Sequence, residues 1–429
     1  MLALAFAASA SAQELTPLGA EAAGNAAGTI PAWQGGLKSP LAGHQSGGAY
    51  ADPYEADVPL FTISTSNLEQ YRAQLSPGQI ALLQKYPTWK INVYPTRRSA
   101  AFPEAVYEET AANAGMAKLV PGGNGVAGAT GGIPFRVPRD GLEAIWNTLL
   151  RYRGDTYATR WGQAAVTRSG AYTMVSFSYE FDFGYGNLAN RAGKANNLVH
   201  QLQTITGPAR LAGQILLVNE PVDPARERRS AWAYEPDRHN VQPAPYVAYD
   251  NPATASDGLA TNDDLQMFNG ATDRYDWKLL GKREMFIPYN SYRISGNRLD
   301  AADVLRPGHI DPDYARYELH RVWVVEATLK EGARHVYRKR VFYIDEDSWS
   351  ISAADEYDMA GELWRVSEQH SINCYDVPML YGTVEVHSDL RSGRYLVAGL
   401  RNGQPRFFEQ IARSSADYTP AVLRARGVR

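Results

Sequence analysis

Much of the sequence after residue 170 alternates between apolar and polar side chains, and this period of two constrains the fold more than any other feature. From residue 175 to 183, Val, Phe, Tyr, Phe and Phe alternate with Ser, Ser, Glu and Asp. Such alternation predicts a strand with one buried face. Similar stretches begin at residues 323, 335, 349, 363, 383 and 394. The sequence therefore predicts a protein dominated by β-sheet.

Short turns separate these stretches. Residues 330–333 place a glycine between two alternating runs, which is typical of a hairpin, and residues 345–347 interrupt the chain again. Consecutive strands joined by short turns pair antiparallel. The sequence from 133 to 410 shows no strand–helix–strand alternation, no repeat and no long linker. We therefore expect an α+β fold with one domain over 61–429, helical at first and mostly antiparallel strands from residue 170.

Capping residues mark three helices. Ser66 is followed three positions later by a glutamate, which is a capping box, and Ser76 precedes a proline at the first position of a helix that ends at Pro87. The clearest helix begins after Asp140, carries apolar residues at helical spacing and ends by Gly154. Its apolar face must pack against a broad surface.

The first residues have the pattern of an export signal. A short apolar run precedes Ala10-Ser11-Ala12, so we expect a signal peptide over residues 1–12, cleaved near Ala12. The run is too short for an integral membrane segment, which needs roughly 20 apolar residues. Residues 13–60 are predicted to form an irregular arm. Cys374 is the single cysteine, so it forms no internal disulfide and is expected to be a small buried residue. These features predict a periplasmic protein.

Charge excludes one class of partner and leaves another open. The chain has 43 basic and 46 acidic residues, a net charge of −3, which argues against a nucleic-acid partner. A basic stretch near residue 338 forms either the solvated face of a sheet or a contact with anionic lipid headgroups or a membrane-protein partner. The candidate contact residues are Arg321, Arg338 and Arg340.

Motifs for catalysis or cofactor binding are missing. The glycine-rich loop 121–132 matches a dinucleotide fingerprint by letter, but prolines replace the strand and the helix that the fingerprint needs. Asp345-Glu346-Asp347 resembles part of a calcium loop without its glycine, and a solvated hairpin turn is favoured. The sequence has no Gly-x-Ser-x-Gly elbow, and its histidines are scattered. We predict no catalytic residue, no metal and no cofactor.

Six segments resemble a proteobacterial periplasmic family of unknown function that is described as outer-membrane lipoprotein-sorting-like. They read LTPLGAE at 15–21, GTIPAW at 28–33, GGIPF at 131–135, DRYDWKLLGK at 273–282, RYELHRVW at 316–323 and FYIDED at 342–347. The resemblance covers nearly the whole chain after residue 12. It implies the LolA/LolB/LppX fold, in which a curved antiparallel sheet forms a half-open β-barrel with helices covering the concave face. It also implies a lipid-like ligand and an inner-membrane exporter of the MMPL type as hand-off partner.

The predicted function is therefore a periplasmic carrier of a lipid-like hydrophobic molecule and not an enzyme. An aromatic sheet face covered by an amphipathic helix provides the walls of an apolar pocket, and each buried CH₂ group contributes roughly 0.8 kcal/mol. The candidate pocket residues are Trp146, Leu149, Phe177, Tyr179, Trp277, Trp323 and Phe342. The alternatives are a periplasmic hydrolase of lipid or ester substrates, an outer-membrane barrel and an exporter adaptor without a ligand.

Overall fold

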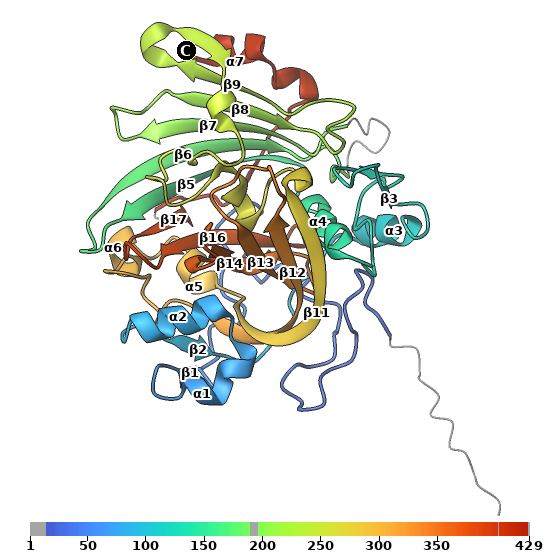
Figure 1. Ribbon diagram of the computed structural model, residues 1–429, viewed down its shortest axis with the longest axis vertical. Helices are drawn as coiled ribbons and strands as arrows, with labels where there is room; N and C mark the ends of the chain where they lie inside the picture. The colour runs from blue at the N-terminus through green and yellow to red at the C-terminus, as the bar shows by residue number, and fades with distance from the viewer. Residues whose placement is uncertain (1–13, 189–195, 402, 428–429) are drawn as a thin grey trace, which may run out of the picture.

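The computed structural model describes residues 14–188, 196–401 and 403–427. The predicted signal peptide lies outside the described residues. The protein has a mixed α+β fold in which one sixteen-stranded, mostly antiparallel sheet dominates and the helices are few (Figure 1). The main path of the sheet runs from β1 at one edge to β10 at the other, and the sheet is not closed into a barrel. This confirms the predicted α+β class.

The order of pairing differs from the order of the chain. The main path is β1 (Phe61–Ile63), β2 (Ile91–Val93), β12 (Tyr317–Leu329), β13 (Lys339–Asp345), β14 (Ile351–Tyr357), β15 (Leu363–Cys374), β16 (Met379–Asp389), β17 (Tyr395–Leu400), β5 (Thr156–Val166), β6 (Tyr172–Asp182), β7 (Val199–Gly207), β8 (Ile215–Glu220), β9 (Ser230–Glu235) and β10 (Asn240–Pro243). The long strand β11 (Tyr275–Pro288) pairs with β12, and β18 (Glu409–Gln410) pairs with β5. A separate hairpin consists of β3 (Lys118–Leu119) and β4 (Val126–Ala127). The last long strand, β17, thus pairs with the early strand β5 and joins the two halves of the sheet.

The predicted strands are present with shifted ends. The alternating run at 175–183 is β6, and the hairpin across 330–333 joins β12 to β13. β13 begins at Lys339 and not at residue 335. Burial still alternates over 335–338, where His335 and Tyr337 are buried and Val336 and Arg338 are exposed. The first long strand, β5, begins at Thr156, before the predicted start of the strands at residue 170. Its burial alternates from Thr156 to Gln163, but two of the buried residues are the polar Thr159 and Gln163, so the period-two signal in the sequence is weaker there.

The helices are short. They are α1 (Leu68–Tyr71), α2 (Pro77–Lys85), α3 (Glu104–Ala112), α4 (Gly141–Leu150), α5 (Tyr292–Ser295), α6 (Ala301–Val304) and α7 (Pro420–Gly427). The caps predicted for the second and third helices are confirmed: Ser76 accepts a hydrogen bond from the backbone of Gln79, and Asp140 accepts one from Glu143. The predicted Ser66 capping box is wrong. Asn67 is the N-cap of α1 without a side-chain cap, because its carboxamide turns back to the backbone of Ser64.

The sheet carries packed layers on both faces. Side chains alternate along β14, so Asp355 and Glu356 project to opposite faces. Asp355 accepts hydrogen bonds from the start of α2, whereas Glu356 lies beside the 3₁₀ segment Asn262–Met267. We call the face of the sheet that carries Asp355 the α2 face. We call the opposite face, which carries Glu356 and is covered by the segment Asn262–Met267, the plug face. In the part of the chain that the structure describes, no helix is long and apolar enough to cross a membrane.

Candidate functional site

A cavity lies between the N-terminal arm, the end of β2 and the region around α5. Its volume is about 580 Å³, within the range that small-molecule pockets occupy. Five tyrosines line it: Tyr50, Tyr54, Tyr94, Tyr292 and Tyr314. Residues 14–60 form neither helix nor strand, and residues 49–57 of this arm are one wall of the cavity.

The cavity has a charged opening and a buried floor. Arg293, Arg298 and Glu55 are exposed, whereas Tyr50 and Tyr292 are buried. Tyrosine rings offer flat apolar area and a polar hydroxyl. The arrangement therefore suits an amphipathic molecule whose apolar part lies on the rings and whose charged group stays at the opening.

A chain of buried polar groups leads from the cavity wall into the protein. Arg316 donates to Glu318 Oε1 at 2.7 Å and to Asp57 at 2.8 Å, and Asn290 donates to the same Glu318 oxygen at 2.9 Å. Glu318 is fully buried, yet its pKa is lowered, because hydrogen bonds and the positive charges of His320 and Arg316 outweigh the cost of burial. The cavity wall is thus rigidly supported.

The turn after β13 is the clearest correction to the sequence reading. Asp345, Glu346 and Asp347 were predicted to form a solvated hairpin turn, but all three are buried. The turn projects inward because cationic side chains from distant segments surround it. Arg98 binds Asp347 through two hydrogen bonds, and Lys282 binds Glu346 at 2.9 Å. No local sequence pattern reports partners that lie so far along the chain.

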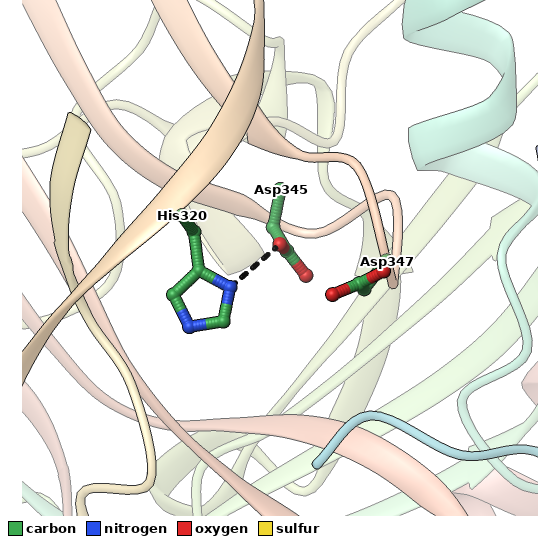
Figure 2. Close-up of side chains that lie close together, drawn as sticks. All are labelled: His320, Asp345 and Asp347. Carbon is green, nitrogen blue, oxygen red and sulfur yellow. Dashed lines mark ion pairs between the residues drawn. The ribbon is translucent and has the colours of Figure 1, made fainter. Parts of the chain in front are cut away.

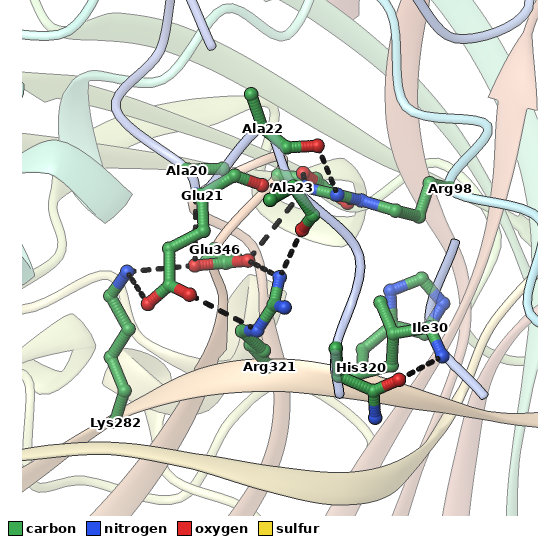
Figure 3. Close-up of polar contacts among 12 residues, drawn as sticks. Ala20, Glu21, Ala22, Ala23, Ile30, Arg98, Lys282, His320, Arg321 and Glu346 are labelled. Carbon is green, nitrogen blue, oxygen red and sulfur yellow. Dashed lines mark hydrogen bonds and ion pairs between the residues drawn. The ribbon is translucent and has the colours of Figure 1, made fainter. Parts of the chain in front are cut away.

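The same turn holds the N-terminal arm in place (Figure 3). Glu21 pairs with Lys282 at 3.0 Å and with Arg321 at 3.3 Å. Arg98 donates to the backbone carbonyl of Glu21 at 2.7 Å. The arm is therefore tied to the sheet by charged hydrogen bonds, which are stronger than neutral ones.

His320 lies between two carboxylates beside this turn (Figure 2). Its Nε2 is 3.2 Å from Glu318, and its Nδ1 is 3.7 Å from Asp345 Oδ1. Burial disfavours a charged imidazole, but the hydrogen bond that His320 donates to Glu318 and the charge of Asp345 outweigh it and raise the pKa of His320. Burial, together with the Asp347 charge, raises the pKa of the Asp345 carboxyl.

The seven predicted pocket residues all belong to the main hydrophobic core or pack against it. Trp277, Trp323 and Phe342 share one sheet face, because each is in register with residues of the same parity on β12, and the rings of Trp277 and Phe342 stack. Tyr179 borders a cavity of about 80 Å³ beneath residues 253–269. Trp146 donates to the carbonyl of Gly123 in the glycine-rich loop at 2.9 Å. None of the seven lines the large cavity, so their role in ligand binding stays a prediction.

The three predicted contact arginines differ in exposure. Arg338 is exposed. Arg340 is buried and donates to Asp263 and Asp264, which belong to the segment on the plug face. Arg321 is buried between Glu21 and Glu346. Contact with a headgroup or partner stays a prediction, and Arg338 is the residue that is accessible for it.

A serine and a histidine meet on the plug face, but the serine directs its proton to a carboxylate. Ser367 Oγ is 2.8 Å from His387 Nδ1 and donates to Glu356 at 2.9 Å. Burial opposes a charge on His387, yet Glu385 and Asp264 outweigh it and raise the pKa. Ser367 donates its proton to Glu356, so His387 is not placed as the base for this hydroxyl. The pair is better explained as a satisfied buried network.

Together, these features define an α+β protein with an open, mostly antiparallel sheet and a tyrosine-lined cavity, whose described lining residues hold no assembled nucleophile–base pair. Cys374, the one thiol, is buried as predicted. Comparison with known sequences identifies the family to which the chain belongs. The chain belongs to the family described as protein of unknown function DUF1329, whose model matches residues 62–424.

A curated relative supports the same membership. The uncharacterised protein PA3922 of Pseudomonas aeruginosa is 47% identical over 418 residues, which are 97% of this chain and 92% of that protein. The resemblance drawn from the six sequence segments is therefore confirmed at the level of the family.

Solved structures with related folds share little sequence with the chain. A putative outer membrane lipoprotein-sorting protein domain from Vibrio parahaemolyticus is 12% identical, with a TM-score of 0.46, and covers 66% of this chain and 98% of its own. A DUF1329 family protein from Desulfovibrio piger is 16% identical, with a TM-score of 0.44, and covers 65% and 95%. The LolA superfamily protein NE2245 from Nitrosomonas europaea is 14% identical, with a TM-score of 0.40, and covers 66% and 98%. Likeness of this strength identifies no ligand.

Proposed function

We propose that the protein is a periplasmic carrier of a lipid-like, amphipathic molecule and that the tyrosine-lined cavity is its binding site. The observation that carries this proposal is the cavity of about 580 Å³, with aromatic rings inside and exposed arginines at its opening. An acyl chain or ring system on the tyrosines gains roughly 25 cal/mol for each Å² of apolar surface removed from water. Arg293 and Arg298 then face an anionic headgroup.

The sequence resemblance adds the finer parts of the proposal. It suggests the periplasmic location, a half-open barrel of the LolA/LolB kind and an inner-membrane exporter of the MMPL type as hand-off partner. The seven core residues named above form a second part of the proposal: they become accessible to a larger ligand if the segment on the plug face moves aside.

The test is native mass spectrometry of the protein purified from periplasm, followed by solvent extraction of any bound molecule. We expect a stoichiometric lipid-like species. In the Tyr54→Ala variant, its affinity should fall five- to tenfold, because one aromatic contact contributes about 1 kcal/mol. Tyr172→Ala is the matched control, since Tyr172 is 38% exposed and lies on β6 outside the cavity. A ligand-free mass that stays unchanged after incubation with membrane lipids would contradict the proposal.

A further inference from the structure

We infer that His320, Asp345 and Asp347 form a binding site for a transition-metal ion, with Zn²⁺ the best match. The three side chains each offer one ligand atom, and these atoms lie within 4.8 Å of one another. All three residues are buried. One imidazole and two carboxylates form a ligand set that Zn²⁺ accepts in proteins. Figure 2 shows the three side chains converging on one point.

The strand pairing produces this convergence. Val322 on β12 lies directly opposite Asp345 on β13, and His320 is two residues before Val322. His320 and Asp345 therefore project from the same face of the sheet. Asp347 follows in the tight turn after β13, where Arg98 orients its carboxylate through two hydrogen bonds of 2.7 and 2.9 Å. A carboxylate has about four lone pairs, so both oxygens of Asp347 retain capacity for a metal.

The surroundings of His320 match those of a metal-binding histidine. Its Nε2 is 3.2 Å from Glu318, and a carboxylate that accepts the second ring N–H is the usual support for such a histidine. The lone pair of Nδ1 then faces Asp345 Oδ1 at 3.7 Å, which is too long for a hydrogen bond. Either a second proton on the imidazole or a metal ion satisfies this buried contact, and the convergence of Asp347 on the same point favours the metal ion.

One carboxylate oxygen of the cluster points to the same place. Among the described residues, none donates a hydrogen bond to Oδ1 of Asp345. The ring of Tyr289, which is 0% exposed, stacks on His320 with centroids 4.0 Å apart and closes this side of the cluster, while its hydroxyl contacts the backbone of Ala100.

The geometry needs a small adjustment. Zn²⁺ bonds to nitrogen and oxygen are roughly 2.0–2.2 Å long, so two atoms bound to one Zn²⁺ are at most about 4.4 Å apart. The three ligand atoms lie within 4.8 Å of one another, so the side chains must move toward one another by a few tenths of an ångström when the ion binds. The inference does not depend on the proposed carrier function, since the three ligands lie outside the lining of the tyrosine cavity.

The test is metal binding by the full chain, first stripped with EDTA and then dialysed against Zn²⁺, with the bound metal counted by plasma mass spectrometry. We expect one Zn²⁺ per chain, and at least tenfold weaker binding in His320→Gln and Asp345→Asn. His309→Gln is the matched control, because His309 is buried against Thr88 and Ile310, away from the three ligands. Co²⁺ in place of Zn²⁺ should show a visible absorption band that His320→Gln lacks.

Two results would overturn the inference: no stoichiometric Zn²⁺ in the unaltered chain, or unchanged affinity in both ligand variants. If the unaltered chain binds no Zn²⁺ and NMR spectra show a protonated His320, then a proton and not a metal ion lies between His320 and Asp345. If the ligand variants do not fold, Tyr289→Phe and Glu318→Gln take their place, with an expected 10- to 100-fold loss of affinity. Unchanged affinity in both of these would also contradict the site.

Discussion

Glu368 shows how one buried carboxyl can make stability depend on pH. It accepts hydrogen bonds from Gln79 at 3.1 Å and from Tyr317 at 2.9 Å. Burial raises its pKa to about 7, against the pull of these two donors. The folded chain therefore binds a proton that the unfolded chain releases near pH 4.5. The stabilisation is complete below that pH and is lost as the pH rises through about 7.

We predict that Glu368→Gln flattens this dependence. In the unaltered protein, Glu368 should lower the free energy of unfolding by roughly 3 kcal/mol between pH 5 and pH 8. Urea unfolding at both pH values measures the difference. Glu362→Gln is the control, because Glu362 is exposed. Equal pH slopes for Glu368→Gln and the unaltered chain would contradict the assignment.

At the scale of elements, α2 can dock only because its second residue is glycine. A Cβ atom on Gly78 would overlap Asp355 Oδ1 and lie 2.7 Å from a methyl carbon of Val366. Gly78→Ala should therefore lower the free energy of unfolding by about 1–3 kcal/mol, although alanine favours helices. Gly186→Ala provides a comparison, since the nearest atom there is 3.7 Å away. Increased stability of Gly78→Ala in urea unfolding would show that α2 packs differently.

The segment on the plug face depends on Arg340. This side chain is fully buried and holds both Asp263 and Asp264. Arg340→Met leaves two buried carboxylates without their cation, a loss of about 3–5 kcal/mol. We expect hydrogen exchange of residues 256–274 to accelerate in this variant. Arg338→Met is the control, because Arg338 is exposed, and it should leave the hydrogen exchange of residues 256–274 unchanged. If both variants changed the exchange to a similar extent, the role of Arg340 would be contradicted.

At the scale of the whole molecule, the N-terminal arm is held against the rest of the protein by hydrogen bonds to its backbone. Trp349 donates to the carbonyl of Leu18 at 3.0 Å, and Arg98 donates to the carbonyls of Glu21 and Pro31. These donors are buried, so each donor that loses its acceptor should lower the free energy of unfolding by about 1–3 kcal/mol.

A chain that begins at residue 37 should thus unfold several degrees lower than one that begins at residue 14. Thermal unfolding of the two chains, followed by circular dichroism, measures this difference. Restoring the arm as a separate peptide should raise the melting temperature of the shorter chain. If both chains melt together, the arm is not part of the folded core.

Local patterns in the sequence were sufficient for the elements that they describe. The alternation at 175–183 predicted β6, and the caps at Ser76 and Asp140 predicted α2 and α4. These signals act over a few residues, through the pleat of a strand or the first turn of a helix. The start of β13 was misplaced. The alternation at 335–338 reports the burial of His335 and Tyr337, and Tyr337 donates to Asp264, 73 residues away, outside the strand pairing.

What the sequence by itself determined was the α+β class, the antiparallel pairing of neighbouring strands and the burial of Cys374. Only the tertiary structure decided where a ligand or a metal could bind. The tyrosine cavity joins residues 49–57 to residues 290–299, and the His320 cluster joins two strands to a turn that Arg98 draws inward. Periodicity reports the environment of each element alone, whereas a site depends on which distant side chains meet, and that is fixed only when the elements pack.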